Sequence, residues 1–121
     1  MNSTAPEAVV QRQLDAYNTK DIESFIAAWA PDAQYFEHPG KLLASGRDAI
    51  RARHVERFAE GNLHGELVKR MVMGNKVVDQ ERVTRTFPEG AGMIEVIAIY
   101  EIDDGLIAKA WFIMGPRIIM K

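Results

Sequence analysis

The feature that most constrains the fold of this chain is a change of hydrophobic pattern near residue 65. Before it, apolar residues recur at the three- and four-residue spacing of a helix face. After it, runs with strand-like alternation are separated by turn signals, which are Gly74-Asn75, Pro88-Glu89-Gly90, Asp103-Asp104-Gly105 and Gly115-Pro116. Helices followed by an antiparallel meander predict an α+β domain.

Two helices and a short strand are predicted before residue 40. The first helix runs from Ala5 to Thr19, and the second follows the N-cap Asp21. The apolar stripe of the second helix comprises Ile22, Phe25, Ile26 and Trp29. Pro31 is expected to end this helix, because the residue before a proline disfavours helical geometry. The short strand is expected over residues 33–38.

A third helix is predicted from about Ser45, with Ile50, His54 and Phe58 facing inward, Val55 beside them, and a stop at 61–62. Four strands are then expected, at 66–73, 76–87, 93–102 and 106–114. We expect the three helices to pack on one face of a strongly curved antiparallel sheet. Such a fold encloses a cone-shaped internal pocket instead of a solid core.

Composition limits the class of protein. The chain has 121 residues, of which 47% are hydrophobic and 26% are charged, so residues 1–121 are expected to form one globular domain. The net charge of −2 gives no indication of nucleic-acid binding. There is no cysteine, no signal-peptide pattern and no apolar stretch near the ~20 residues of a membrane span. We therefore expect a cytoplasmic protein that binds neither nucleic acid nor membrane.

Short motifs in the first half resemble those of a known family. They are Val9-Val10-Gln11-Arg12, Asn18, Asp21-Ile22, Ala30-Pro31-Asp32-Ala33, Glu37-His38-Pro39-Gly40 and Ser45-Gly46-Arg47-Asp48-Ala49-Ile50. In this order they resemble the SnoaL-like polyketide cyclases and ketosteroid isomerases of the nuclear transport factor 2-like superfamily. The second half resembles the family by its strand order. The resemblance implies the fold and a pocket for a small, mostly apolar molecule.

The catalytic identities of ketosteroid isomerase are not found at the matching positions. The position of the general base is occupied by His38, and the first oxyanion donor corresponds to Gln13, with Tyr17 one turn later. The second donor aligns with Ala98, and a cavity-lining tyrosine of the family corresponds to His54. Because that reaction depends on a base and two matched donors, steroid isomerisation is not predicted.

Four side chains are candidates for acid–base chemistry. His38 titrates near pH ~6.5 and could act as a base, or it could be a strand-end histidine bonded to backbone. His54 must face a cavity or find a partner in the core. Alternation in the strand 76–87 places Asp79 and Glu81 on one face with Val77, Val83 and Arg85. If this face points inward, the carboxylates can orient the imidazoles; otherwise the strand is solvated or faces a dimer partner.

The late strands are expected to present two different apolar faces. The register implied by the resemblance turns Val96, Ala98, Tyr100, Ala110, Phe112 and Met114 inward. The opposite face carries Ile97, Ile99, Lys109, Trp111 and Ile113, and its hydrophobicity predicts a homodimer through the sheet. The side chains expected to contact a ligand are Gln13, Trp29, Phe36, Phe58, Val96, Ala98, Tyr100 and Phe112.

Three functional hypotheses follow. The first is a cofactor-independent enzyme of isomerase, cyclase or hydrolase type, with His38 as base, Asp79 or Glu81 orienting it, and Tyr17 or His54 donating to an oxyanion. The second is a non-catalytic binding module for a small hydrophobic ligand. The third is a dimeric interaction domain with an incidental pocket. The histidines lack metal-ligand spacing, so neither metal nor cofactor is predicted.

Overall fold

The computed structural model describes residues 3–120 as three helices and six strands. In chain order they are α1 (Pro6–Thr19), α2 (Ile22–Ala27), β1 (Trp29–Glu37), β2 (Lys41–Ser45), α3 (Arg47–Arg57), β3 (His64–Met73), β4 (Lys76–Phe87), β5 (Gly90–Asp103) and β6 (Leu106–Ile119). The α+β class is confirmed. The third helix follows β1 and β2, so a hairpin lies between the second and third helices.

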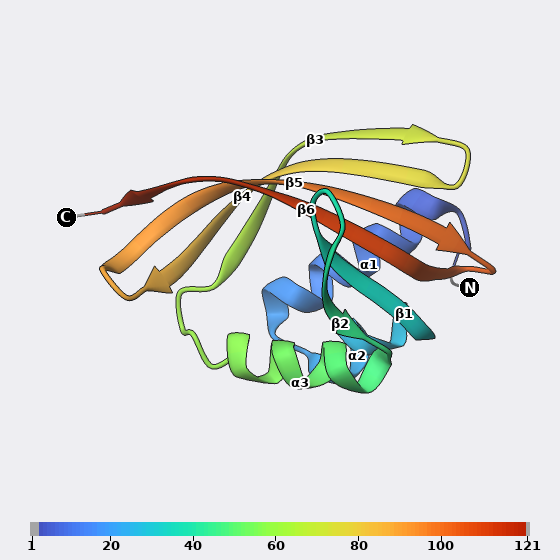
Figure 1. The fold of residues 1–121 in the computed structure, drawn as a ribbon, viewed down its shortest axis with the longest axis horizontal. Coiled ribbons are helices and arrows are strands. Elements are labelled where there is room, and N and C mark those ends of the chain that lie inside the picture. Colours follow the sequence, from blue (N-terminus) through green and yellow to red (C-terminus); the bar gives the residue numbers. More distant parts are fainter. Residues whose placement is uncertain (1–2, 121) are drawn as a thin grey trace.

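All six strands belong to one sheet in the order β2-β1-β6-β5-β4-β3. The four late strands form the expected antiparallel meander, but β1 runs parallel to β6, so the sheet is mixed and the expected wholly antiparallel sheet is wrong. Figure 1 shows α1, α2 and α3 on one side of the long strands. The core lies between this helical layer and the inner face of the sheet.

Local interactions position the helices. Asp21 caps α2 by accepting a hydrogen bond from the Ser24 backbone N–H at 3.2 Å. The Asn18 side chain, at the end of α1, bonds both backbone groups of Gly65 in β3: Nδ2 donates to the carbonyl at 2.9 Å, and Oδ1 accepts from the N–H at 2.7 Å. Arg47 at the start of α3 donates to the Trp29 carbonyl. Specific contacts therefore tie α1 to β3 and α3 to β1, while α2 is stabilised by its own N-cap.

The second helix ends earlier than predicted. It stops at Ala27, Trp29 begins β1, and Pro31 lies inside that strand. The register between β1 and β6 is irregular between Trp29 and Gln34, so the missing N–H of Pro31 removes no ladder hydrogen bond. The stripe prediction for Trp29 is wrong because the segment changes from helix to strand within two residues.

Two strands differ from the prediction. The five-residue β2 was not predicted, because its mostly exposed residues show no clean alternation. The last strand continues through Gly115-Pro116 to Ile119. At Gly115-Pro116 its ladder with β5 shifts register, between Ile94 and Val96 of β5. A Cβ at position 115 would lie 2.9 Å from the Glu95 carbonyl oxygen. This apparent turn signal therefore marks an irregularity inside a long strand.

The core is built from both layers. Phe25 from α2, Ile50 from α3 and Trp29 from β1 are fully buried, together with Val9 and Val10 of α1. By contrast, Val55 is half exposed and does not belong to the inward stripe. Within residues 3–120, no helix is long and apolar enough to cross a membrane.

Candidate functional site

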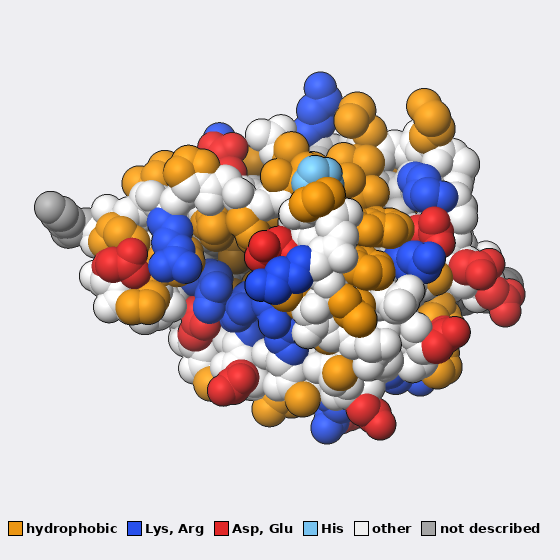
Figure 2. Space-filling view, in the orientation of Figure 1, with side chains coloured by type: hydrophobic (Ala, Val, Ile, Leu, Met, Phe, Trp, Pro, Cys, Tyr) orange, Lys and Arg blue, Asp and Glu red, His pale blue; other side chains and the backbone are white. Residues whose placement is uncertain are grey.

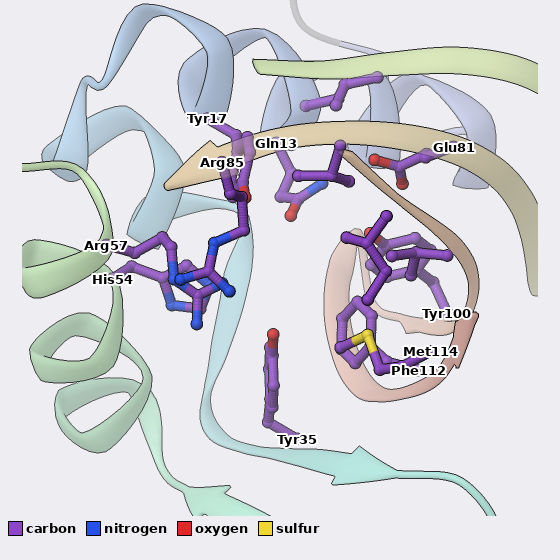
Figure 3. A pocket seen from close by; sticks show the side chains of 14 residues that line it. Gln13, Tyr17, Tyr35, His54, Arg57, Glu81, Arg85, Tyr100, Phe112 and Met114 are labelled. Carbon is purple, nitrogen blue, oxygen red and sulfur yellow. The ribbon is translucent and has the colours of Figure 1, made fainter. Parts of the chain in front are cut away.

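A cavity of about 80 Å³ lies between α1, α3 and the inner face of the sheet (Figure 3). Its lining combines aliphatic and aromatic side chains with several ionisable ones. The lining residues are Gln13, Leu14, Tyr17, Tyr35, His54, Arg57, Glu81, Val83, Arg85, Ile94, Val96, Tyr100, Phe112 and Met114. Of the two orientations left open for β4, the structure shows the inward one, since Val77, Asp79, Glu81 and Val83 are all buried.

Glu81 is the acidic residue of this lining. Its side chain is only 7% exposed, and no hydrogen bond or ion pair to the carboxylate is found within residues 3–120. Burial, reinforced by the negative charge of Asp79, raises the pKa of Glu81 to about 7, despite an opposing effect of Arg70. The carboxyl group therefore exchanges its proton near neutral pH.

Gly65 makes room for the Glu81 carboxylate. A Cβ at position 65 would lie 3.1 Å from Glu81 Oε1 and 3.3 Å from a methyl group of Leu14. Because glycine has no side chain, the carboxylate lies against β3 beneath α1 without a steric conflict. The same glycine is the one that Asn18 holds.

Asp79 lies two residues away on the same face of β4 but does not line the cavity. It is fully buried and accepts two hydrogen bonds from Arg70, from Nε at 2.7 Å and from Nη2 at 2.9 Å. Arg70 Nη1 also donates to the Gln11 side chain of α1 at 2.8 Å. Asp79 is therefore engaged in a structural ion pair and has no access to a ligand in the cavity.

His54 lines the cavity from α3 and is 3% exposed. Burial lowers its pKa to about 4, so the ring is neutral at physiological pH. Its Nδ1 lies 2.8 Å from the Ile50 carbonyl oxygen. Since a carbonyl only accepts, Nδ1 carries the hydrogen and Nε2 keeps its lone pair. Neutral His54 thus offers an acceptor, and the expectation that it donates to an oxyanion is not met by this tautomer.

Three tyrosines supply hydroxyl groups to the cavity. Burial raises the pKa of Tyr17 to about 12 and also raises the pKa values of Tyr35 and Tyr100, so all three remain protonated donors. In Figure 3 the hydroxyls of Tyr17, from α1, and Tyr35, from β1, point into the space between Glu81 and His54. Aromatic contacts hold their rings: the ring centroids of Tyr17 and Phe58 lie 5.6 Å apart, and Tyr35 stacks on Phe112 with a centroid distance of 4.5 Å.

Arginines surround the opening of the cavity. Arg57 from α3 and Arg85 from β4 line both the cavity and an adjoining surface depression, which also includes Arg53, Glu56 and Glu60. Figure 2 shows basic side chains gathered around a hollow on this face. We call these five residues the mouth.

His38, the predicted base, does not line the cavity. It is exposed in the turn between β1 and β2, and its backbone N–H donates to the Phe112 carbonyl at 2.9 Å. The strand ends at Glu37, one residue before the histidine, so the side chain lies outside the sheet. The predicted meeting of His38 with His54 at one hollow is therefore not found.

The predicted ligand contacts divide into two groups. Gln13, Val96, Tyr100 and Phe112 line the cavity, as does the candidate donor Tyr17. Of the remaining four, Trp29 and Ala98 are fully buried in the core, and Phe58 packs against Tyr17 and Phe25 at the end of α3.

Phe36 lies on the wrong side of the sheet for a ligand contact. Its ring stacks on that of Trp111, with a centroid distance of 5.6 Å, on the face of the sheet opposite the helices. The physical reason is strand alternation: its neighbour Tyr35 faces inward, so Phe36 faces outward. Ile97 and Ile113 of the same outer face are partly exposed.

Sequence reasoning missed Tyr35 and Arg57 as lining residues and placed Arg85 only on the same face of its strand as Glu81. Arg57 follows His54 by three residues, and this spacing on a helix could have identified it. Tyr35 lies in the predicted strand 33–38, where residue type alone does not distinguish a cavity-lining ring from a core ring. Within residues 3–120, no group of three or more His, Asp or Glu side chains could hold a metal ion.

Comparisons with known proteins identify the family. The model of the SnoaL-like domain matches residues 10–110, whereas no curated protein sequence matches the chain. A cystatin-fold protein from Novosphingobium aromaticivorans superimposes with a TM-score of 0.81 at 21% identity, covering 89% of this chain and 97% of that one. A candidate ketosteroid isomerase from Kribbella flavida gives 0.80 at 16% identity, covering 99% and 84%.

A candidate polyketide cyclase from Sinorhizobium meliloti gives a TM-score of 0.72 at 26% identity, covering 86% of this chain and 92% of that one. These structures share the fold, and the family model spans most of the chain. The resemblance seen in the sequence motifs is thereby confirmed: the chain belongs to the SnoaL-like domain family of the nuclear transport factor 2-like superfamily.

Proposed function

We propose that this protein is a cofactor-independent acid–base enzyme that acts on a small, mostly apolar carbonyl compound, with Glu81 as the general base. The observation that carries this proposal is a buried carboxylate, without a hydrogen-bond or ion-pair partner among residues 3–120, in a cavity lined by three protonated tyrosines. A base is most effective when its pKa is close to the working pH, and Glu81 meets this condition. Glu81 thus replaces His38 in the role that the motif resemblance implied.

The reaction that fits best is proton transfer next to a carbonyl group. In a ketone with a β,γ double bond, Glu81 removes a proton from the carbon between the carbonyl and the double bond. The electron pair of the broken C–H bond forms a double bond to the carbonyl carbon, and the π pair of the carbonyl moves onto its oxygen. Tyr17 and Tyr35 donate hydrogen bonds to that oxygen as its negative charge develops. Protonated Glu81 then gives the proton to the γ carbon. The oxygen pair restores the carbonyl, the remaining double bond shifts into conjugation with it, and the isomerisation is complete without any cofactor.

The cavity also limits the substrate. A volume of about 80 Å³ is well below that of a usual ligand site, so the cavity can enclose only a small group, and its lining is largely aliphatic and aromatic. We propose that the inner face of the sheet and the three helices form the cone-shaped pocket of this family, with Glu81 on one wall and His54 on the opposite one. The lone pair on His54 Nε2 would accept a hydrogen bond from a substrate hydroxyl group.

Isomerisation of cyclohex-3-en-1-one to its conjugated isomer, followed by ultraviolet absorbance, tests the proposal. We expect Glu81→Gln to reduce the rate by about 10²–10⁴-fold, the usual contribution of a positioned base. The wild-type rate should rise with pH through an apparent pKa of about 7, because the base works when deprotonated. His38→Ala is the matched control and should leave the rate unchanged. Equal rates in Glu81→Gln and the wild type would exclude this role.

A non-catalytic binding module is the second candidate, and the same cavity supports it. When Glu81 is protonated, below its pKa of about 7, the lining carries no carboxylate charge and suits storage of an apolar ligand. In that case the probe enone would bind to the wild type and to Glu81→Gln alike, without turnover in either protein.

Homodimerisation through the outer face of the sheet stays a prediction. Phe36, Trp111, Ile97 and Ile113 form an apolar surface there, across β1, β6 and β5. We expect light scattering to give twice the chain mass, and Ile97→Lys to shift the protein toward the mass of one chain. A wild-type protein of single-chain mass at ~0.1 mM, where specific dimers of micromolar affinity are assembled, would refute the dimer.

A further inference from the structure

We infer that the mouth selects a ligand bearing a carboxylate, so the substrate is an apolar molecule with one anionic end. This inference rests on the proposed function and specifies its substrate class. It starts from a charge imbalance: three arginines, Arg53, Arg57 and Arg85, surround the opening, whereas only two glutamates, Glu56 and Glu60, share it. One positive charge is therefore in excess where a ligand would enter.

The pairing within the mouth locates that excess. Glu60 is bonded to Arg85, with Nη2 to Oε2 at 2.8 Å and Nε to Oε1 at 3.3 Å, and it also accepts from the Thr86 backbone N–H at 3.0 Å. Its contact with Arg57 is long, 3.8 Å from Nε to Oε2. Arg85 is thus well neutralised, whereas among residues 3–120 this long contact is the one ion pair of Arg57, so its charge is only weakly compensated.

Arg53 adds a second incompletely paired guanidinium. Within residues 3–120 it forms no ion pair, and its Nε is buried without a hydrogen-bond partner. Its guanidinium carbon lies 5.3 Å from the centre of the Tyr35 ring, which holds it beside the cavity. Arg53 and Arg57 are four residues apart on α3 and therefore project from the same face.

The geometry points to a carboxylate more than to a doubly charged phosphate. Guanidinium groups bind planar carboxylates through paired hydrogen bonds, and an excess of one positive charge matches a single negative charge. Figure 3 places Glu81 and Arg57 on opposite sides of the cavity. A ligand whose carboxylate contacts Arg57 would extend its apolar body toward Glu81, so the mouth anchors the substrate and orients its reacting carbon.

Calorimetric binding of cyclohex-3-ene-1-carboxylate and of its neutral carboxamide tests this inference at pH 6, where most Glu81 is protonated. We expect the wild type to bind the carboxylate about tenfold more tightly, and this preference to shrink as NaCl is added. Arg57→Gln should bind both probes equally. Arg51→Gln is the matched control, because Arg51 lies on the same helix and pairs with Glu23 instead; it should keep the preference.

The outcomes separate this inference from the proposed function. Glu81→Gln should lose enone isomerisation but keep the preference for the carboxylate, whereas Arg57→Gln should lose the preference for the carboxylate. Equal affinity for the two probes in the wild type, binding of neither, or a preference that survives both Arg57→Gln and Arg53→Gln would overturn the inference. Tighter binding of benzylphosphonate than of phenylacetate would overturn the choice of a carboxylate.

Discussion

Two carboxylates on the same face of β4 have opposite surroundings. Asp79 accepts hydrogen bonds from the Arg70 guanidinium at 2.7 and 2.9 Å, whereas Glu81 forms no ion pair within the described part of the chain and faces a cavity. Both are buried, at 0% and 7% exposure, so burial alone does not distinguish them. The comparison shows that a buried acid is either paired with a cation or inclined to hold a proton, according to what lies opposite it.

The cross-strand neighbours on β3 account for the difference. Asp79 pairs with Arg70 in the ladder, and Glu81 pairs with Leu67. On the other side, β5 places Ala98 beside Asp79 and Val96 beside Glu81, and neither carries a polar side chain. The charge of Asp79 is therefore compensated within the sheet, whereas Glu81 lowers its cost of burial by holding a proton.

The largest expected effect comes from removing the compensation of Asp79. Arg70→Leu leaves a fully buried carboxylate without a partner, and it also removes the hydrogen bond to Gln11. We expect the free energy of unfolding at pH 7 to fall by about 3–5 kcal/mol, measured by urea denaturation. The double variant Arg70→Leu/Asp79→Leu should recover most of this loss. If the double variant is as unstable as the single one, the loss comes from packing and the comparison fails.

A smaller effect is expected from Glu81, and it depends on pH. Because the pKa of Glu81 is raised from 4.5 to about 7 by folding, the native state binds more protons than the unfolded chain between these values. This contribution to stability is complete below pH ~4.5 and is lost as pH rises through about 7. The stability advantage of Glu81→Gln over the wild type should therefore grow by about 3 kcal/mol between pH 4.5 and pH 8, measured by urea titrations.

His54 provides an internal check on this prediction. Its pKa is lowered from 6.5 to about 4, so its protonation destabilises the native state as pH falls below 6.5. That effect is common to both proteins and cancels in their difference. A further variant, Leu67→Arg, gives Glu81 the kind of partner that Asp79 has and should reduce the pH dependence. A difference in stability that is constant with pH would show that Glu81 is ionised in the native state.

The sequence predicted one half of this comparison. The alternation in β4 correctly placed Asp79 and Glu81 on one common face but left open whether this face points inward, and its bounds of 76–87 were correct. It could not predict which of the two would be paired, because that depends on the register with β3, which includes an irregularity between Leu67 and Lys69. Local pattern determines the face of a strand, but only tertiary pairing determines the partner.

The misplacement of His38 has a related cause. The motif resemblance aligned it with a catalytic position, but β1 ends at Glu37, and the side chain that follows lies in an exposed turn. A shift of one residue at a strand end changes which side chain faces inward. The fold of the family was predictable from many motifs together, whereas the identity of the base depended on a single position.

The two hydrogen bonds between the Asn18 side chain and the Gly65 backbone link the position of α1 to the proton affinity of Glu81, the proposed base. These two residues hold the end of α1 against the strand under which the Glu81 carboxylate lies, with Leu14 close by. Lifting this end of α1 would let water reach the carboxylate and return its basicity toward that of an ordinary surface glutamate. Reactivity in this protein would then be tuned from the backbone of a neighbouring strand, at a residue that has no side chain.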